Sequence, residues 1–236
     1  GAALAFLDPL YSSGHDLSAL IHELAIPQIL ADLEGHADTS AIDRVNRGFA
    51  SVIDHFAVLY TDNAIVLADP AIASLAIGWD QLVYFGWLAA LGVSGKLGDP
   101  TLAHASVALA DRVHRLNVRV HALLRRWALA RRGQPRKPLH HARVDQGQVP
   151  LIMDRFFRLE PLVRGEADAP DVLACLHETV DRLELSALGL LDRACADQGH
   201  RFPSEPLDPY AIGFDPSRWA AEGLFARRRA RDQDLR

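Results

Sequence analysis

The sequence predicts a mainly α-helical protein. Apolar residues recur at helical spacing through most of its 236 residues, and capping residues or prolines stand where helices would begin. Hydrophobic residues make up 49% and charged residues 23% of the chain, a composition typical of soluble globular proteins. We therefore expect a helical fold around a substantial hydrophobic core.

The first residues depart from this helical pattern. The apolar run AALAFL stops at Asp8-Pro9, which predicts a short N-terminal strand or extended segment before the first helix. The run has no polar lead-in, so we expect it to continue a strand from an upstream part of a longer parent protein. Ser12 and Ser13 then offer hydroxyl caps for the first helix.

Several helices are predicted after this turn, and each begins at a cap or a proline. The segment Pro70 to Leu91 is apolar on nearly every side, which indicates a centrally buried helix. The expected helix starts are Ser12 or Ser13, Thr39 or Ser40, Pro70, Pro100 and Asp171, with a kink or restart at Pro27 and a last helix that contains Trp219 and Phe225.

Four regions follow from these signals. Residues 1–14 form the N-terminal strand and turn, residues 15–132 a helical region, residues 133–149 a basic loop, and residues 150–236 a C-terminal helical region. The loop combines Gly, Gln, Pro and basic residues without periodicity, which makes it the best internal boundary.

Charge and cysteine content narrow the class of protein. A net charge of −5 gives no reason to expect nucleic acid as a partner. No apolar run reaches the roughly 18 residues of a membrane helix, and the first residues carry no secretory leader, so no membrane association is expected. Cys175 and Cys195 fit reduced, buried thiols. Together these features predict a cytoplasmic protein.

Ten basic and no acidic residues occur between Arg112 and Arg143. Such a run is usually a solvated helix face, but it also suits the acidic surface of a carrier protein. Its members are Arg112, Arg115, Arg119, Arg125, Arg126, Arg131, Arg132, Arg136, Lys137 and Arg143.

The eleven histidines predict no metal site, because none falls in an HExxH, ExxH or paired Cys/His spacing. His114 and His121 share a predicted helix face but are assigned no ligand role. His15 follows the first turn, where it acts on a substrate or halide or is simply exposed to solvent. The tryptophans Trp79, Trp87 and Trp127 indicate core positions, with the wall of a substrate channel as the alternative.

The turn DPLYSSG is the segment best suited to chemistry. The unpaired N–H groups and partial positive charge of a helix N-terminus suit a phosphate, a carboxylate, a flavin oxygen or a halide. By physics alone the simpler interpretation is favoured, in which Ser12 and Ser13 only cap their own helix.

The segment GAALAFLDPLYSSG, residues 1–14, resembles the pattern GDAA-x-x-x-DP-x-x-S-S/T-G of flavin-dependent halogenases and their monooxygenase relatives. In that family this strand, turn and helix lie beside the flavin ring of FAD. The resemblance implies FAD contacts at Gly1, Asp8, Pro9 and Leu10. It also implies a halide bound by the amides of Ser13 and Gly14.

The same resemblance implies that the chain is the helical C-terminal part of an FAD-dependent oxidoreductase. Tyr11 stands where phenol- and pyrrole-type halogenases commonly carry an aromatic residue, which implies a phenol- or pyrrole-type or carrier-bound substrate. The chain holds no GxGxxG fingerprint and no counterpart of the family's upstream catalytic lysine, since Lys96 and Lys137 fall in later loops. We therefore expect it to be inactive without its N-terminal FAD-binding region. A flavin reductase and an acidic carrier protein are further implied partners.

Two alternatives stay open at this point. Ala2 replaces the family's usual Asp, which favours a related flavin monooxygenase or reductase without a halide site. A non-enzymatic helical module that binds a partner through its basic face is the third hypothesis.

Overall fold

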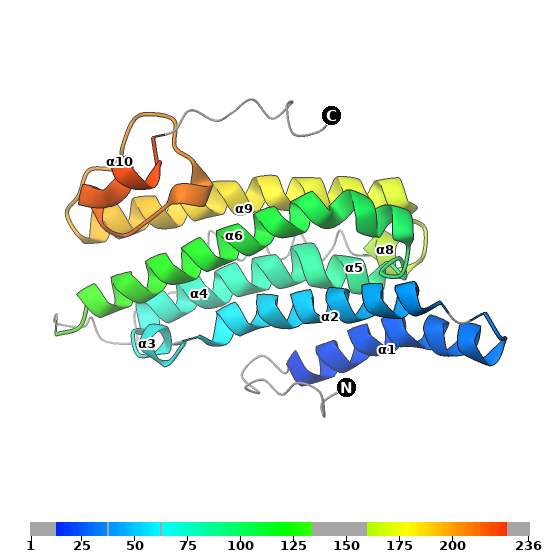
Figure 1. Ribbon diagram of the computed structural model, residues 1–236. Coiled ribbons are helices and arrows are strands. Elements are labelled where there is room, and N and C mark those ends of the chain that lie inside the picture. Colours follow the sequence, from blue (N-terminus) through cyan, green and yellow to red (C-terminus); the bar gives the residue numbers. More distant parts are fainter. Residues whose placement is uncertain (1–12, 37, 62, 134–159, 226–236) are drawn as a thin grey trace.

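The computed structural model of this chain describes residues 13–36, 38–61, 63–133 and 160–225 (Figure 1). Within these residues the protein is mainly helical and contains no strand, which confirms the predicted fold class. The expected strand at residues 1–7 and nearly all of the basic loop lie outside the described residues. The elements are α1 (Ser13–Leu33), α2 (Thr39–Tyr60), α3 (Asn63–Leu67), α4 (Pro70–Val83), the π-helix η2 (Tyr84–Leu88), α5 (Ala89–Val93), α6 (Pro100–Ala130), α8 (Glu160–Val163), α9 (Ala169–Asp197), the short turns η4 (Pro209–Ala211) and η5 (Pro216–Arg218), and α10 (Trp219–Glu222).

Aspartates begin most of the long helices. The side chains of Asp69 and Asp99 accept hydrogen bonds from backbone N–H groups at the starts of α4 and α6, each immediately before a proline. Asp168 forms a reciprocal capping box with Asp171 at the start of α9. The cap of α2 is Asp38, rather than the expected Thr39 or Ser40. Its carboxylate accepts a hydrogen bond from the Ser40 amide at 2.8 Å.

The core lies between α4, α6 and α9. Helices α6 and α9 run side by side over most of their length (Figure 1). Trp79 on α4 is completely buried, and Trp87 and Trp127 are nearly so, which confirms the predicted core positions of all three. Cys195 is buried in the same core and Cys175 is partly buried, and neither forms a disulfide.

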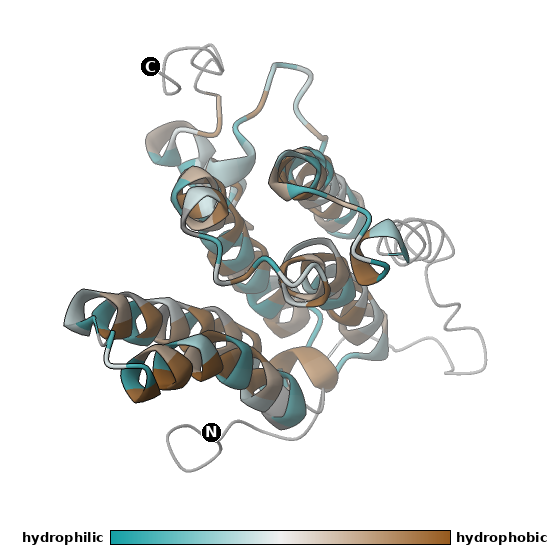
Figure 2. Ribbon diagram, turned by 90° about the vertical axis from the view of Figure 1, so that its right-hand side faces the viewer, coloured by the Kyte–Doolittle hydropathy of each residue, from teal (hydrophilic) through white to brown (hydrophobic). Residues whose placement is uncertain are grey.

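Helices α1 and α2 form a pair beside this core, and Figure 2 shows them set off from the other long helices. Leu17 and Leu20 of α1 are buried, but the second half of the helix is not covered. Pro27 lies inside α1, which is helical on both sides of it. The exposed apolar side chains of this half are Ile26, Ile29, Leu30 and Leu33.

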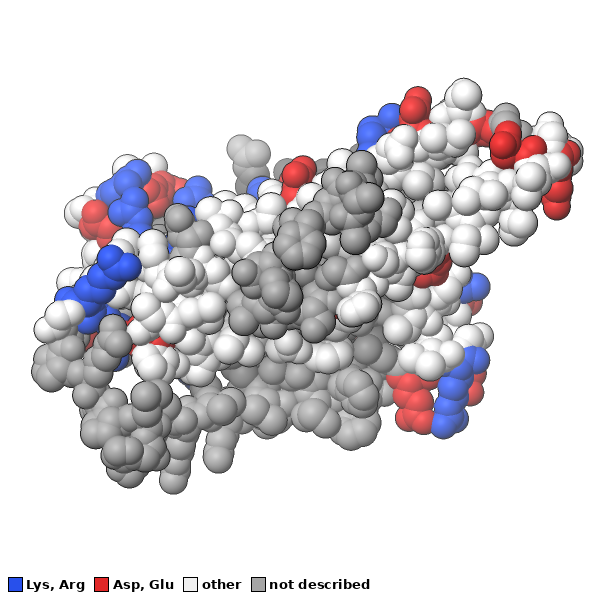
Figure 3. Space-filling model, turned by 90° about the horizontal axis from the view of Figure 1, so that it is seen from below, with Lys and Arg blue, Asp and Glu red and all other residues white. Residues whose placement is uncertain are grey.

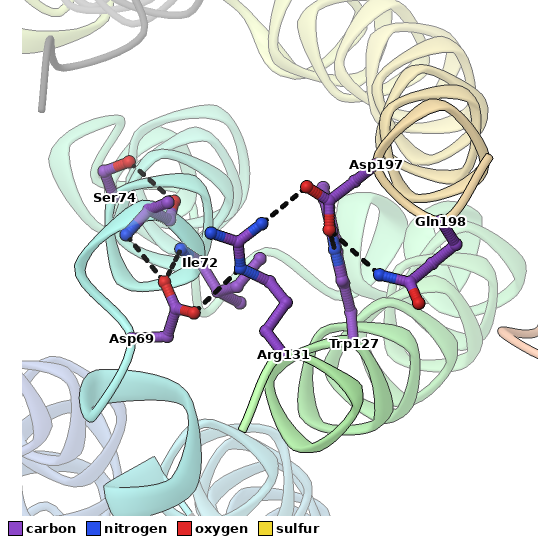
Figure 4. A network of polar contacts seen from close by, with 8 residues as sticks. Asp69, Ile72, Ser74, Trp127, Arg131, Asp197 and Gln198 are labelled. Carbon is purple, nitrogen blue, oxygen red and sulfur yellow. Dashed lines mark hydrogen bonds and ion pairs between the residues drawn. The ribbon is translucent and has the colours of Figure 1, made fainter. Parts of the chain in front are cut away.

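Arg131 joins three helices at the other end of the bundle (Figure 4). Its guanidinium donates to Asp69 at the start of α4, at 2.8 Å, and to Asp197 at the end of α9. The indole of Trp127 donates to the same Asp197 carboxylate at 2.7 Å. Opposite charges placed between helix ends in this way fix the spacing of α4, α6 and α9.

A second partly buried ion pair anchors the C-terminal segment. Arg112 on α6 contacts Glu184 on α9 at 2.5 Å, and Tyr210 of η4 donates to the same carboxylate at 2.6 Å. The last predicted helix is shorter than expected, since α10 ends at Glu222 and leaves Phe225 outside it. Gly223 ends this helix in the left-handed conformation that glycine favours.

Candidate functional site

Of the residues predicted to contact the halide or the flavin, the structure describes the two halide residues, at the start of α1. Ser13 and Gly14 are the first two residues of this helix, so the predicted helix start at the hydroxyl turn is confirmed. Gly1, Asp8, Pro9 and Leu10 lie outside the described residues. The expected FAD and halide contacts at this turn therefore remain predictions.

A pocket opens beside the first turns of α1. It lies between α1, Phe56 of α2 and the continuous helix formed by η2 and α5, and we call it the Tyr84 pocket. Its main lobe has a volume of about 250 Å³ and its second lobe about 140 Å³. The residues that line both lobes are Asp16, Phe56, Tyr84 and Leu88.

Small residues create the main lobe. Ala19 on α1 faces it from one side, and Ala89 and Gly92 of α5 line the other. A Cβ atom at Gly92 would come within 3.4 Å of Leu20, so larger residues here would fill the space. A small apolar cavity with a few polar groups is the usual form of a small-molecule site.

Asp16 and Tyr84 form a hydrogen bond across the pocket wall. Burial raises the pKa of the Asp16 carboxyl, although the bond from Tyr84 and the charge of nearby His15 act to lower it. Burial and the Asp16 carboxylate also raise the pKa of the Tyr84 phenol, which stays a donor. The pair thus offers a partly desolvated carboxylate with one oxygen fixed by the phenol.

A buried polar pair supports the second lobe. Asp80 lines this lobe, and its carboxylate contacts Nε2 of His121 at 2.9 Å. The two side chains are almost fully buried and join α4 to α6. Next to them, the indole of Trp79 donates to Oδ1 of Asn117 at 2.8 Å. Asp80 and Tyr84 are four residues apart, so this network and the pocket share one helix face.

The pocket coincides with a π-helix. Within η2 the Ala89 amide donates to the carbonyl of Tyr84, five residues earlier, which widens the helix at the pocket. The Gly86 carbonyl accepts a hydrogen bond from the Thr179 hydroxyl of α9 at 2.9 Å. Single π-helical turns inside α-helices occur frequently at functional sites.

The structure assigns roles to several other residues singled out in the sequence. His121 belongs to the core, whereas His15 is exposed on the first turn of α1. No group of three metal-ligating side chains occurs in the described part of the chain. In the basic run, Arg112 and Arg131 are held in internal ion pairs, while Arg119 is exposed on α6.

Sequence reasoning missed both the Asp80–His121 pair and the Tyr84 pocket. One signal for the pair was available: Asp80 is the one charged residue inside the mostly apolar segment AIGWDQLV, where an unpartnered carboxylate would be costly. No spacing rule links it to His121, which lies 41 residues away.

Comparisons were made with known protein families, curated proteins and solved structures, and nothing matches the chain. None of the helices in the described residues is long and apolar enough to cross a membrane.

Proposed function

We propose that this chain is the helical, substrate-binding side of an FAD-dependent, halogenase-like oxidoreductase that acts on a small aromatic substrate. One observation carries the proposal: the Tyr84 pocket opens beside the helix into which the DPLYSSG turn leads. Asp16 on the pocket wall comes two residues after Gly14, or roughly 3 Å along the helix axis. A flavin edge or halide held at the turn would therefore adjoin the pocket.

The residues at the start of α1 fit the group that the proposal requires. The first amides of a long helix favour an anion or an electron-rich flavin oxygen, and Ser13 and Gly14 occupy these positions in α1. Bound FAD would supply the oxidising chemistry, with Gly1, Asp8, Pro9 and Leu10 as its proposed contacts. The described residues would bind and orient the substrate and exclude water from it.

The uncovered half of α1 also favours the proposal that a further region of the protein packs against it. Leu33 is 78% exposed, and Ile26, Ile29 and Leu30 are each more than half exposed. Figure 3 looks onto this side of the molecule, where few charges interrupt the projecting end until its acidic tip. Contiguous exposed apolar surface marks interaction sites. We propose that an upstream FAD-binding region covers it.

The test is to express the chain together with its upstream coding sequence. The proposal expects FAD to copurify and brominated or chlorinated products to form from phenol- or pyrrole-type substrates when a flavin reductase is supplied. Gly92→Leu, which fills the Tyr84 pocket, should abolish product formation while FAD is retained. Glu34→Gln at the exposed end of α1 is the matched control and should act as the wild type does. A longer protein that binds no flavin would overturn the proposal.

Two other functions have an observation in their favour. The Ala2 departure favours a flavin monooxygenase, which would give hydroxylated products whose yield does not depend on bromide or chloride. The exposed arginines Arg119 and Arg126 of α6, with Arg132 just after its end, favour docking of an acidic carrier protein or a purely partner-binding role. A substrate loaded on a carrier protein distinguishes an enzyme that docks the carrier from a module that only binds it, because only the enzyme modifies the substrate.

A further inference from the structure

We propose that the Tyr84 pocket binds an arylalkylamine and that Asp16 and Glu23 receive its ammonium group. This inference rests on one part of the proposed function, that the Tyr84 pocket is the substrate site. Binding itself requires neither flavin nor halide.

The two acids lie on one face of α1. Asp16, Ala19, Leu20 and Glu23 follow the spacing of a single helix face, and all four line the main lobe. Leu20 is buried at the base of this face, while the two carboxyls stand at either side of it. The pocket therefore has a carboxylate near each end of its α1 wall.

Both carboxyls are partly withdrawn from water. Burial raises the pKa of Glu23, and it is the largest influence on Asp16, whose pKa is also raised. The carboxylates thus lose solvation when the protein folds, before any ligand binds. A cation between them recovers this loss, whereas a second anion would increase it.

The rest of the lining points to the same ligand. No Lys or Arg lines either lobe among the described residues, so an anionic ligand would find no opposite charge. His15, next to Asp16 in the chain, is exposed rather than part of the wall. The rings of Phe56 and Tyr84 line both lobes, and aromatic rings attract cations as well as other rings.

The dimensions limit the ligand to one ring system with a short side chain. The main lobe is smaller than the roughly 300 Å³ at which pockets for drug-sized ligands begin. Ala89 and Gly92, which carry little or no side chain, line the wall opposite α1, and Tyr84 on the same helix bonds to Asp16 but not to Glu23. An arylalkylamine fills such a lobe with its ring on the apolar side and its ammonium toward α1.

The experiment titrates the 236-residue chain with three ligands that share one ring: phenethylamine, phenethyl alcohol and hydrocinnamate. Dissociation constants come from ligand titrations followed by NMR. We expect the amine to bind at least about tenfold more tightly than the alcohol, because a hydrogen bond to a charged group is worth about a factor of ten or more. Hydrocinnamate should bind most weakly. Equal binding of all three would overturn the inference.

Variants locate the effect. Glu23→Gln and Asp16→Asn should each reduce the preference for the amine severalfold, and Gly92→Leu should remove binding of both amine and alcohol. Glu34→Gln changes the net charge equally but lies outside the pocket, and it should keep the wild-type preference. If the amine preference survives in Glu23→Gln and Gly92→Leu, with circular dichroism showing both folded, the pocket is not the amine site.

The two proposals fail separately. Amine selectivity in a chain whose longer form binds no flavin would overturn the oxidoreductase proposal and leave the ligand class standing. Halogenation or hydroxylation of phenols without any amine preference would do the reverse.

Discussion

Gly86 and Thr179 lie so close together that no other residue fits at Gly86 without a shift. A Cβ atom added to Gly86 would stand 2.5 Å from the Thr179 methyl group, inside contact distance. The same threonine donates its hydroxyl to the Gly86 carbonyl. This contact holds the π-helix, and with it one wall of the Tyr84 pocket, against α9.

The first prediction follows from that contact. Gly86→Ala should destabilise the protein by about 1–3 kcal/mol, because overpacking a close contact outweighs the better helix propensity of alanine. Denaturation in urea measures this loss. Thr179→Ser in the same background keeps the hydroxyl and removes the clashing methyl, so it should restore much of the stability. Gly92→Ala, with 3.4 Å to its nearest neighbour, is the control and should cost little. Full stability of Gly86→Ala would contradict the packing described for η2.

A second prediction concerns the Asp80–His121 pair. His121→Ala leaves the Asp80 carboxylate buried without this partner and should cost about 3–5 kcal/mol. His104 is exposed on the same helix, so His104→Ala should change stability by less than about 0.5 kcal/mol. The double variant Asp80→Leu with His121→Leu replaces both buried polar side chains with apolar ones and should recover part of the loss. A His121→Ala protein as stable as His104→Ala would show that the pair contributes nothing.

The sequence was sufficient for the helices because their signals are local. Asp69-Pro70 and Asp99-Pro100 place a carboxylate cap and a preset backbone angle directly before an apolar periodic segment, and both helices begin there. The tryptophans could likewise be assigned to the core, since large apolar residues recur on the helix faces that pack together. The differences lie at helix ends: the cap of α2 is Asp38, α9 begins at Ala169 rather than Asp171, and α10 ends before Phe225.

The candidate site could not be predicted in the same way because it depends on contacts between distant helices. Asp16 and Tyr84 are separated by most of α1 and by the whole of α2, α3 and α4, and nothing in the local pattern around either residue indicates the other. The pocket between them comes from small residues on opposite helices, such as Ala19 and Gly92, which in sequence look like ordinary helix positions. The pocket exists because of how the helices pack in three dimensions, and local sequence patterns do not reveal that packing.

A third prediction tests the hydrogen bond between Tyr84 and Asp16. The Tyr84 phenol lowers the pKa of Asp16 against the larger effect of burial, which raises it. In Tyr84→Phe the carboxyl should therefore titrate at a higher pH than in the wild-type protein, as followed by carboxyl carbon NMR. The loss of stability should be about 1 kcal/mol. An unchanged titration midpoint would mean that the phenol does not bond to this carboxyl in solution.

A fourth prediction concerns stability in acid. Burial acts to raise the pKa of Asp197, but the hydrogen bonds from Trp127 and Arg131 outweigh it and the pKa is lowered from 3.8. A carboxyl with a lowered folded-state pKa contributes stability above its unfolded pKa and loses it as the pH falls toward the folded value. We therefore expect stability to fall below a pH of about 3.8, the ordinary value. Arg131→Gln should make this fall shallower. An equally steep fall in the variant would assign the acid sensitivity to other carboxyls.

The last prediction concerns the uncovered half of α1. Leu30 and Leu33 are 54% and 78% exposed, so replacing both with glutamine removes almost no buried contact and should leave the free energy of unfolding, measured in urea, within about 0.5 kcal/mol of the wild type. Leu17→Gln, on the packed side of the same helix and 4% exposed, should cost several times more, because it buries an amide in the core. The double variant should also reduce self-association in sedimentation velocity, since exposed apolar surface promotes it. In the longer protein the same two replacements should weaken flavin retention if an upstream region covers this face. Wild-type flavin retention there would show that the face serves another contact, and a large loss of stability in the 236-residue chain would show that the face is already buried.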